Sequence, residues 1–254
     1  MTGRPLRLSP IAFVLVAAAC GGGGGATTTK ATAPTTTPAE TTSVRVYFLL
    51  HGKVQPVERT VPKTNAVATA AYTELLRGPT RDETGIGLTT ALGTSPGSGW
   101  TIGVGSDGLL GLSSKPLAGP ALAQTVYTLT QFPGRETVIV NGKRYARNDF
   151  EDVTPAILVE SPLPFAHVTS PLRATGTANT FEATFRYELA DVAGRVLGRH
   201  FVTATSGNGI RGTFDVTIPF MDTRAGPGTL IVYENDAATG KRINEVDLPL
   251  TLEP

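Results

Sequence analysis

Two glycine-rich stretches have the residue types and spacing of loops that carry chemistry in other proteins. Residues 93–97, Gly-Thr-Ser-Pro-Gly, place Ser95 in the G-x-S-x-G spacing of a nucleophile elbow, which needs a strand before the serine and a helix after it. Residues 103–108, Gly-Val-Gly-Ser-Asp-Gly, have the G-x-G-x-x-G spacing of a dinucleotide loop, which must open a helix. In both places a strand is predicted to follow. We therefore interpret the first stretch as a turn and the second as part of a hairpin.

The other side chains that could act as bases or ligands are few and scattered. His51, His167 and His200 lack the spacing of metal ligands, so we expect them at the surface or at strand edges. Residues 148–152, Asn-Asp-Phe-Glu-Asp, carry oxygen ligands that calcium accepts, but they lack the glycine turn of a calcium loop and are interpreted as a solvated linker. The single tryptophan, Trp100, is expected to pack in a core rather than to form a sugar-stacking platform. The sequence therefore predicts no catalytic residue, no cofactor and no metal site, and we expect the protein not to be an enzyme.

The only cysteine, Cys20, follows a short apolar run and precedes five glycines. Residues 1–19 have the features of a secretory signal, and their apolar run is far shorter than the ~20 residues of a membrane-spanning helix. Residues 16–20, Val-Ala-Ala-Ala-Cys, resemble the bacterial lipobox; the alternative is an ordinary signal followed by a cysteine without a role. The resemblance implies that Cys20 becomes the first mature residue and carries a diacylglyceryl thioether. Two acyl chains give stable anchoring, so we expect the protein on the extracytoplasmic side of the cell membrane.

The composition after removal of the signal excludes some classes of partner. Residues 1–19 hold two arginines and no acidic residue, so their removal changes the formal charge from +1 to −1, and a nucleic-acid partner is not expected. Residues 20–43 comprise the lipidated cysteine and a Gly-, Thr- and Pro-rich stretch, which is predicted to be a disordered tether. Its threonines either form a bare spacer or carry O-linked sugars. The remaining chain is long enough for two domains of about 100 residues each.

Residues 44–147 are predicted to form an α+β domain with the order ββαββαβ, in which a small sheet packs on two helices. The first helix is expected to start at Thr64 or Asn65 as its N-cap and to end at Gly78. The other predicted elements are strands at 44–50 and 57–61, a hairpin at 100–104 and 109–112, a second helix at 117–131 and a strand at 136–140. Residues 80–99 are expected to form turns.

Several motifs in this segment resemble the GerMN domain of bacterial sporulation and germination lipoproteins. Residues 71–80, Ala-Tyr-Thr-Glu-Leu-Leu-Arg-Gly-Pro-Thr, are similar to the family's helix ending, and residues 124–133 match a second motif. Residues 46–48 and 92–94 complete the resemblance, although Leu92 replaces the family's usual proline. The run Leu-Gly-Leu-Ser after residue 109 lacks the acid that the family usually has there. The resemblance implies the α+β fold but assigns no catalytic residue.

Residues 156–254 are predicted to form an all-β antiparallel sandwich of about seven strands, because short alternating runs recur without a helical stripe. The clearest run has Phe181, Ala183, Phe185, Tyr187 and Leu189 on its predicted inner face. Motifs at 160–162, 170–178, 181–183 and 229–234 resemble the immunoglobulin-like domain that accompanies GerMN in spore-germination proteins. The fold class is thus predicted as α+β, with a small mixed GerMN-like domain followed by an immunoglobulin-like sandwich.

Together these patterns predict a non-catalytic, lipid-anchored binding or assembly protein of the bacterial envelope. The resemblance implies an accessory factor of the sporulation and germination type. Its expected partners are the membrane, through Cys20, and an unidentified envelope protein, which we expect to contact exposed strand edges of the sandwich. Two alternatives stay open: a cell-wall carbohydrate-binding lipoprotein, which needs exposed aromatic side chains, and a hydrolase with an unrecognised site.

Overall fold

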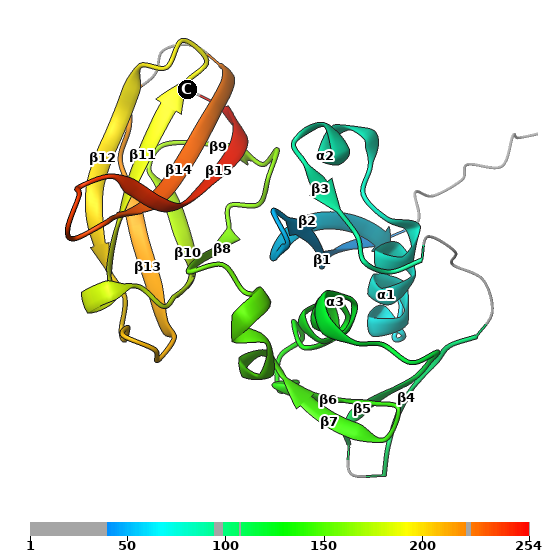
Figure 1. Ribbon diagram of the computed structural model, residues 1–254. Coiled ribbons are helices and arrows are strands. Elements are labelled where there is room, and N and C mark those ends of the chain that lie inside the picture. Colours follow the sequence, from blue (N-terminus) through cyan, green and yellow to red (C-terminus); the bar gives the residue numbers. More distant parts are fainter. Residues whose placement is uncertain (1–39, 94–98, 107, 222–224, 254) are drawn as a thin grey trace, which may run out of the picture. The chain divides into compact units, whose positions relative to one another are not determined.

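The computed structural model describes residues 40–93, 99–106, 108–221 and 225–253, all of which belong to one compact unit. Within this unit residues 40–153 form an α+β region, and residues 157–253 form a β-sandwich, called the sandwich below (Figure 1). The predicted α+β fold class is correct at this coarse level. The division into two separate domains around residues 148–155 stays a prediction. None of the described helices is long and apolar enough to cross a membrane.

The α+β region starts with a hairpin of β1 (Thr41–Leu50) and β2 (Lys53–Pro62). His51 and Gly52 connect the strands with φ values of 50° and 78°, and such paired positive φ values match the right-handed twist of a tight hairpin. The short strand β3 (Leu88–Thr89) pairs with the end of β1, so the sheet order is β2-β1-β3. Because β1 begins at Thr41, it takes in residues 41–43, which the sequence had predicted as tether.

Two helices, α1 (Val67–Arg77) and α3 (Gly119–Leu129), pack against β1 and against each other. The predicted stripe of Leu122, Val126 and Leu129 is buried, as expected. The predicted N-cap of α1 is wrong, since Ala66 occupies that position. The Thr64 hydroxyl accepts a hydrogen bond from the Ala66 N–H at 3.1 Å, so it stabilises the turn before the helix and leaves the helix without a side-chain cap.

The stretch predicted as turns contains a short helix, α2 (Arg81–Gly85). A capping box starts it: the Thr80 hydroxyl accepts from the Glu83 N–H, and the Glu83 carboxylate accepts from the Thr80 N–H. The same carboxylate accepts two hydrogen bonds from Arg59 of β2, at 2.5 and 2.7 Å. This buried ion pair holds α2 against the first sheet. The helix α2 was not predicted, because five residues are too few to show a helical repeat.

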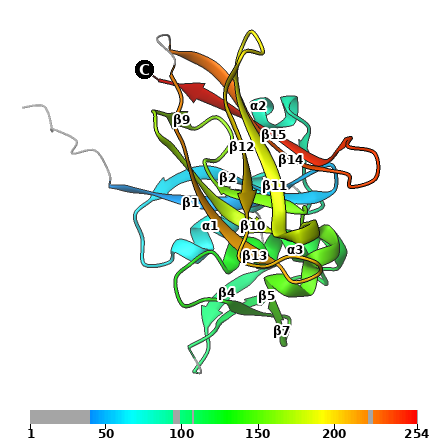
Figure 2. The ribbon, with the colours of Figure 1, turned by 90° about the vertical axis from the view of Figure 1, so that its left-hand side faces the viewer.

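A second sheet follows, with the order β4-β5-β6-β7. Its strands are β4 (Thr101–Val104), β5 (Leu110–Ser113), β6 (Thr137–Val140) and β7 (Lys143–Ala146). The prediction of one small sheet is therefore wrong. Strands β5 and β6 are parallel, and a parallel pair needs a crossover connection, which α3 provides. Figures 1 and 2 show α3 between the two sheets.

The sandwich consists of a three-stranded and a five-stranded sheet, with the orders β13-β10-β8 and β12-β11-β14-β15-β9. The strands are β8 (Ile157–Ser161), β9 (His167–Val168), β10 (Leu172–Ala178), β11 (Thr184–Asp191), β12 (Val196–Thr203), β13 (Gly212–Ile218), β14 (Gly226–Asn235) and β15 (Arg242–Leu252). These eight strands agree with the expected number of about seven. The expectation of purely antiparallel pairing is wrong at one place, because β9 runs parallel to β15.

The predicted inner face of the clearest alternating run is correct from Phe185 to Leu189 and wrong at Phe181. Phe181 begins a 3-10 turn, η2 (Phe181–Ala183), and its side chain is 64% exposed. Glu182 and Ala183 have φ values of 53° and 56°, which break the alternation of side chains before β11 starts.

The segment predicted as a solvated linker is instead an ordered 3-10 segment, η1 (Arg147–Val153). Phe150 is buried against Tyr145, with ring centroids 5.9 Å apart, and Asp149 accepts a hydrogen bond from the Ala146 N–H. The acidic composition of the segment suggested solvation, but its side chains serve as caps and ion-pair partners.

Candidate functional site

Polar side chains of α3 bind the free edge of β1. On that edge β3 pairs only with Leu49 and Leu50 among the described residues, so the backbone groups of Arg45 and Tyr47 have no neighbouring strand. Three side chains of α3, or of the residues just after it, form the hydrogen bonds that a neighbouring strand would form there: Gln131, Thr128 and Gln124.

The hydrogen bonds of this polar stripe follow the pattern of a strand pair. The Gln131 amide accepts from the Arg45 N–H and donates to the Arg45 carbonyl, both at 2.6 Å. Thr128 Oγ1 accepts from the Tyr47 N–H at 3.1 Å, and Gln124 Nε2 donates to the Tyr47 carbonyl at 2.9 Å. Gln124 and Thr128 are fully buried. Buried backbone groups without a partner are unfavourable, so this stripe allows α3 to pack beside β1.

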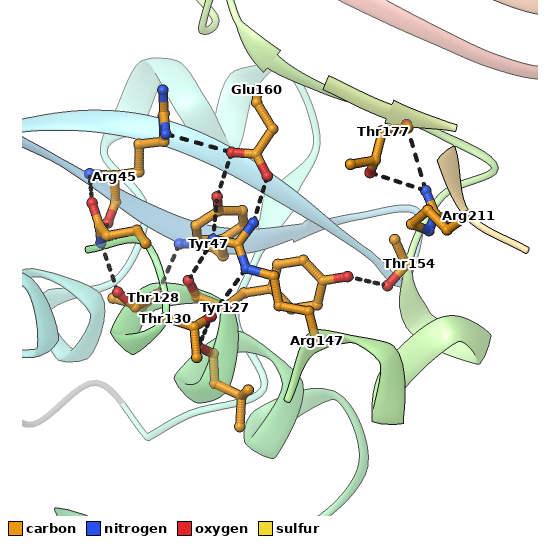
Figure 3. Close-up of polar contacts among 12 residues, drawn as sticks. Arg45, Tyr47, Tyr127, Thr128, Thr130, Arg147, Thr154, Glu160, Thr177 and Arg211 are labelled. Carbon is orange, nitrogen blue, oxygen red and sulfur yellow. Dashed lines mark hydrogen bonds and ion pairs between the residues drawn. The ribbon is translucent and has the colours of Figure 1, made fainter. Parts of the chain in front are cut away.

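The stripe positions Tyr47 within a cluster of four residues, Tyr47, Tyr127, Arg147 and Glu160, called the joining cluster below (Figure 3). The Tyr47 hydroxyl donates to Glu160 Oε2 at 2.6 Å, and Arg147 Nη1 donates to Glu160 Oε1 at 2.8 Å. Arg147 Nη2 also donates to the Tyr47 hydroxyl at 3.1 Å. Because these residues come from β1, α3, η1 and β8, the cluster connects the α+β region to the first strand of the sandwich.

Aromatic rings enclose the charge of Arg147. Its guanidinium carbon lies 5.2 Å from the centroid of the Tyr47 ring and 4.8 Å from that of Tyr127. Burial, followed by the neighbouring charge of Glu160, raises the pKa of Tyr47 far above its ordinary value. Burial lowers the pKa of Arg147, but Tyr47 and Glu160 outweigh it, and the net pKa is raised. Tyr47 therefore stays a hydroxyl donor and Arg147 stays charged at every physiological pH.

A second group of polar contacts lies at the other end of η1. Arg211 donates to both carboxylate oxygens of Glu151, at 2.8 and 2.9 Å, and to the Pro155 carbonyl at 2.8 Å. The Glu151 carboxylate also accepts from Asn179 at 2.7 Å. The hydrogen bonds of Arg211, the largest effect, and of Asn179 lower the pKa of Glu151. The Tyr127 hydroxyl pairs with Thr154 at 2.6 Å, which links this group to the joining cluster.

The joining cluster has the geometry of a structural connection. A covalent or acid–base mechanism needs a nucleophile or base with a free lone pair facing the substrate. Here both oxygens of Glu160 accept hydrogen bonds from Tyr47 and Arg147, and Tyr47 is buried and held as a donor. A cleft of about 510 Å³ lies beside the cluster, lined by Arg45, Phe132 and Glu160 among others. The chemistry available to the cluster is therefore binding and positioning.

The structure does not gather the histidines into one site. His51 lies in the β1–β2 turn, His167 in β9 and His200 in the outer strand β12, and all three are exposed, as expected. His167 Nδ1 lies 2.9 Å from a carboxylate oxygen of Glu253. Within the described residues no group of three or more His, Cys, Asp or Glu side chains is placed to hold a metal ion.

The other sequence motifs have separate outcomes. The described residues 103–106 and 108 belong to the β4–β5 hairpin, where the Gly105 N–H donates to the Leu109 carbonyl, so the hairpin interpretation is confirmed. Trp100 packs edge-on against Tyr72 at a centroid distance of 5.0 Å, as expected for a core residue. Ser95 and the lipid-attachment candidate Cys20 lie outside the described residues.

Sequence reasoning missed the joining cluster. Arg147 and Glu160 were assigned to a boundary and to a family motif, and Tyr47 was treated as an ordinary strand residue. One signal was available: Gln124, Thr128 and Gln131 have helical spacing of four and three, so they form a polar stripe on a helix that otherwise reads as apolar.

The comparisons with known proteins agree with this architecture. Residues 45–146 match the family model described as "Sporulation and spore germination", and residues 156–241 match that described as "Immunoglobulin-like domain of bacterial spore germination". A comparison with curated proteins found no match.

Two solved structures have remote similarity. Tandem GerMN domains of the sporulation protein GerM from Bacillus subtilis align with 15% identity and a TM-score of 0.31, over 72% of this chain and 63% of that chain. CopC from Methylosinus trichosporium OB3b aligns with 14% identity and a TM-score of 0.24, over 39% of this chain and 94% of that chain. Both TM-scores are too low to support an argument about fold, so the assignment depends on the two family models. The chain therefore combines a domain of the sporulation and spore germination family with the immunoglobulin-like domain of bacterial spore germination.

Proposed function

We propose that the protein is a lipid-anchored, non-catalytic accessory factor of the bacterial envelope that acts by binding another protein. The observation that carries the proposal is the joining cluster. Its ionised and hydroxyl groups are hydrogen-bonded to one another, and they connect the α+β region to the sandwich. Such a connection holds binding surfaces of both parts in a fixed arrangement, which lowers the conformational entropy lost when a partner binds.

The place of action follows from the lipobox-like residues 16–20. We propose that Cys20 carries the lipid and that the protein works on the extracytoplasmic side of the cell membrane. The Gly- and Thr-rich residues that follow Cys20 then separate the folded part from the bilayer.

One of the cavities, unlike the cleft that Phe132 lines, lacks the aromatic platform of a carbohydrate site. The cavity of about 380 Å³ lined by His51, Lys53, Gln55 and Arg211 has no phenylalanine, tyrosine or tryptophan among the residues that line it. Aromatic faces are the usual platforms for sugar rings, so this cavity lacks the main element of such a site.

Crosslinking in intact membranes tests the proposed function. The full-length protein with a C-terminal affinity tag is crosslinked, solubilised and purified, and the captured proteins are identified by mass spectrometry. We expect one envelope protein to be enriched over a tag-only control, and its recovery to fall with Cys20→Ser because that variant loses its place at the membrane. The proposal is wrong if no protein exceeds the control, or if the purified protein hydrolyses ester, peptide or peptidoglycan substrates.

Metabolic labelling tests the anchor separately. Cells that produce the wild type or Cys20→Ser receive a fatty-acid probe, and the tagged protein is examined for incorporated label. We expect label in the wild type and none in the variant, which should accumulate as a precursor. Label that persists in Cys20→Ser would show that the lipid is attached to another residue.

A further inference from the structure

The strand β12 has an open edge. It is the outermost strand of the five-stranded sheet, and among the described residues it pairs only with β11 (Figure 1). It is eight residues long. Seven of these residues, including Phe201, are exposed or half-buried, and Val202 is the one buried residue of the strand. An edge strand of this length offers unpaired N–H and C=O groups to another strand.

The position of His200 identifies which backbone groups face outward. The Phe201 N–H donates to the ring nitrogen Nδ1 of the preceding His200 at 2.9 Å, so it does not take part in the ladder with β11. In an antiparallel edge strand the outward groups belong to alternate residues. Arg199, Phe201 and Thr203 therefore direct their N–H and C=O groups toward the open edge. The bond between neighbouring residues is local, and an incoming strand can replace it.

The side chains beside this edge are an aromatic ring and two cations. Phe201 is 55% exposed and the Arg199 side chain is 69% exposed. Arg186 of β11 lies directly opposite Phe201, is exposed, and forms no ion pair with the described residues. The acid opposite Arg199 is Glu188, whose Oε1 lies 3.9 Å from Arg199 Nη1. Glu188 is buried and also accepts hydrogen bonds from Arg242 and from the Tyr233 hydroxyl, so two arginines share one carboxylate. The surface along the edge is therefore apolar and positively charged.

Other edges of the sandwich carry features that oppose strand addition. β13, at the edge of the smaller sheet, carries Asp215 in an ion pair with Arg173, and β9 is only two residues long. β8, at the opposite edge of the smaller sheet, contacts β2 of the α+β region. Edge strands are commonly protected by shortness, charge or cover. β12 is not short, and although it contacts β13 near Gly198, no strand of the described residues pairs with its outer edge.

We propose that the open edge of β12 receives an extended, acidic segment of the partner protein as an added strand. This rests on the proposed function, because it names the surface and the kind of segment that protein binding would use. The backbone groups of Arg199, Phe201 and Thr203 form the ladder. Acidic side chains of the segment pair with Arg186 and Arg199, and an apolar side chain two residues from an acidic one, on the same face of the strand, packs on Phe201.

A second copy of the chain fits this edge poorly. Two β12 strands side by side would bring Arg199 of both copies onto neighbouring strands, with Arg186 one strand further in on each side, and like charges close together in a sheet are destabilising. Positive charge on the edge thus favours a segment of opposite charge over self-pairing.

A peptide titration with hydrogen exchange tests the proposal on the purified full-length protein in detergent. The probe is a fluorescent peptide as long as β12, 8 residues, in which glutamate and valine take turns on one face of the strand and threonine fills the other face (Glu-Thr-Val-Thr repeated). One matched peptide has lysine in place of glutamate, and another has proline in place of two valines so that it cannot pair. We expect the glutamate peptide to bind at least about tenfold more tightly than either, more weakly as salt rises, and with slower amide exchange at Phe201 and Thr203.

Variants separate the backbone contribution from the charge contribution. Phe201→Pro removes the outward N–H and should abolish binding, since proline at an edge position blocks pairing. Arg186→Glu combined with Arg199→Glu keeps the backbone and should weaken binding by about tenfold or more. Arg144→Glu in β7 is the control, because Arg144 is also exposed on a strand and the variant makes the same change of charge per site. Its affinity should equal that of the wild type.

Three results would overturn the proposal: equal binding of the lysine peptide, binding without protection of β12, or protection of β12 that grows with protein concentration without peptide. The last result would identify a second copy as the occupant. The crosslinking experiment separates this proposal from the proposed function. If Phe201→Pro and the charge-reversed variant capture the envelope partner as well as the wild type does, the β12 edge is not the site, while protein binding stands.

Discussion

Tyr47 and Glu160 lie 113 positions apart in the sequence, and the Tyr47 hydroxyl donates a 2.6 Å hydrogen bond to the Glu160 carboxylate. This contact connects the central strand of the first sheet to the first strand of the sandwich. The same carboxylate accepts from Arg147, so one acidic residue neutralises a charge that is enclosed by two tyrosine rings.

Replacement of Glu160 by glutamine should destabilise the protein. The Glu160 side chain is 13% exposed, and its loss leaves the Arg147 charge without its carboxylate partner. We expect Glu160→Gln to lower the free energy of unfolding by about 2–3 kcal/mol, measured by urea denaturation. The double variant Glu160→Gln, Arg147→Met should lose less than the sum of the single variants, because the unpaired charge is then absent.

The control for this pair is the exposed ion pair of Arg173 and Asp215. Asp215→Asn should change the stability little, since solvent and salt screen charges at the surface. Equal effects of Asp215→Asn and Glu160→Gln would contradict the role assigned to the joining cluster.

Replacement of Gln124 by leucine should lower the free energy of unfolding, although the two side chains have similar volumes. Gln124 is fully buried, donates to the Tyr47 carbonyl and accepts from the Ala91 N–H at 2.8 Å. Leucine removes the partner of the Ala91 N–H and leaves the carbonyl of the buried Tyr47 unpaired, so we expect a loss of about 2–4 kcal/mol in urea denaturation. Thr73→Val on α1 is the control, because the Thr73 hydroxyl bonds only within its own helix, to the Thr69 carbonyl; it should lose less than about 1 kcal/mol.

The Arg59–Glu83 ion pair should make the stability depend on pH in the acidic range. Burial raises the pKa of Glu83, but the hydrogen bonds from Arg59 and Thr80 outweigh it, so the net pKa lies below the ordinary value of 4.5. A folded-state pKa below the unfolded one adds stability above the unfolded pKa, and this stability is lost as the pH falls through the folded pKa.

Glu83→Gln therefore should be less stable than the wild type near neutral pH. The difference in free energy of unfolding should shrink as the pH falls from about 6 to about 3, measured by urea denaturation at each pH. Glu40→Gln, which removes the carboxylate of an exposed ion pair with Lys63, is the charge-matched control. A constant difference between wild type and Glu83→Gln over this range would show that the pair does not titrate as argued.

Replacement of Gly176 by alanine should disrupt the three-stranded sheet. Gly176 lies at an irregularity between β10 and β8, and an added Cβ would stand 2.0 Å from the Leu158 carbonyl oxygen. Backbone must shift to relieve this clash, so we expect a loss of about 2 kcal/mol or more by thermal or urea denaturation. Gly103→Ala in β4 is the control, since no atom lies within 4 Å of its added Cβ, and it should change stability by less than about 1 kcal/mol.

The sequence alone determined the main elements and their broad arrangement. Helical spacing of Leu122, Val126 and Leu129 indicated α3, and alternation from Phe185 to Leu189 indicated β11, because both patterns reflect burial of one face of a regular element. The motifs of both families lie within such elements, which is why the two domain families were recognisable. Short or irregular elements such as α2 and η1 lacked a repeat long enough to reveal them.

Only the tertiary structure decided how these elements meet. Sequence showed that Gln124, Thr128 and Gln131 share one face of a helix, but the fold alone places that face beside the unpaired edge of β1. Likewise, Tyr47, Arg147 and Glu160 carry no local pattern that connects them. Hydrogen bonds and ion pairs act over a few ångströms of space, whereas periodicity reports burial along a single element, so contacts between distant segments appear only when the chain is folded.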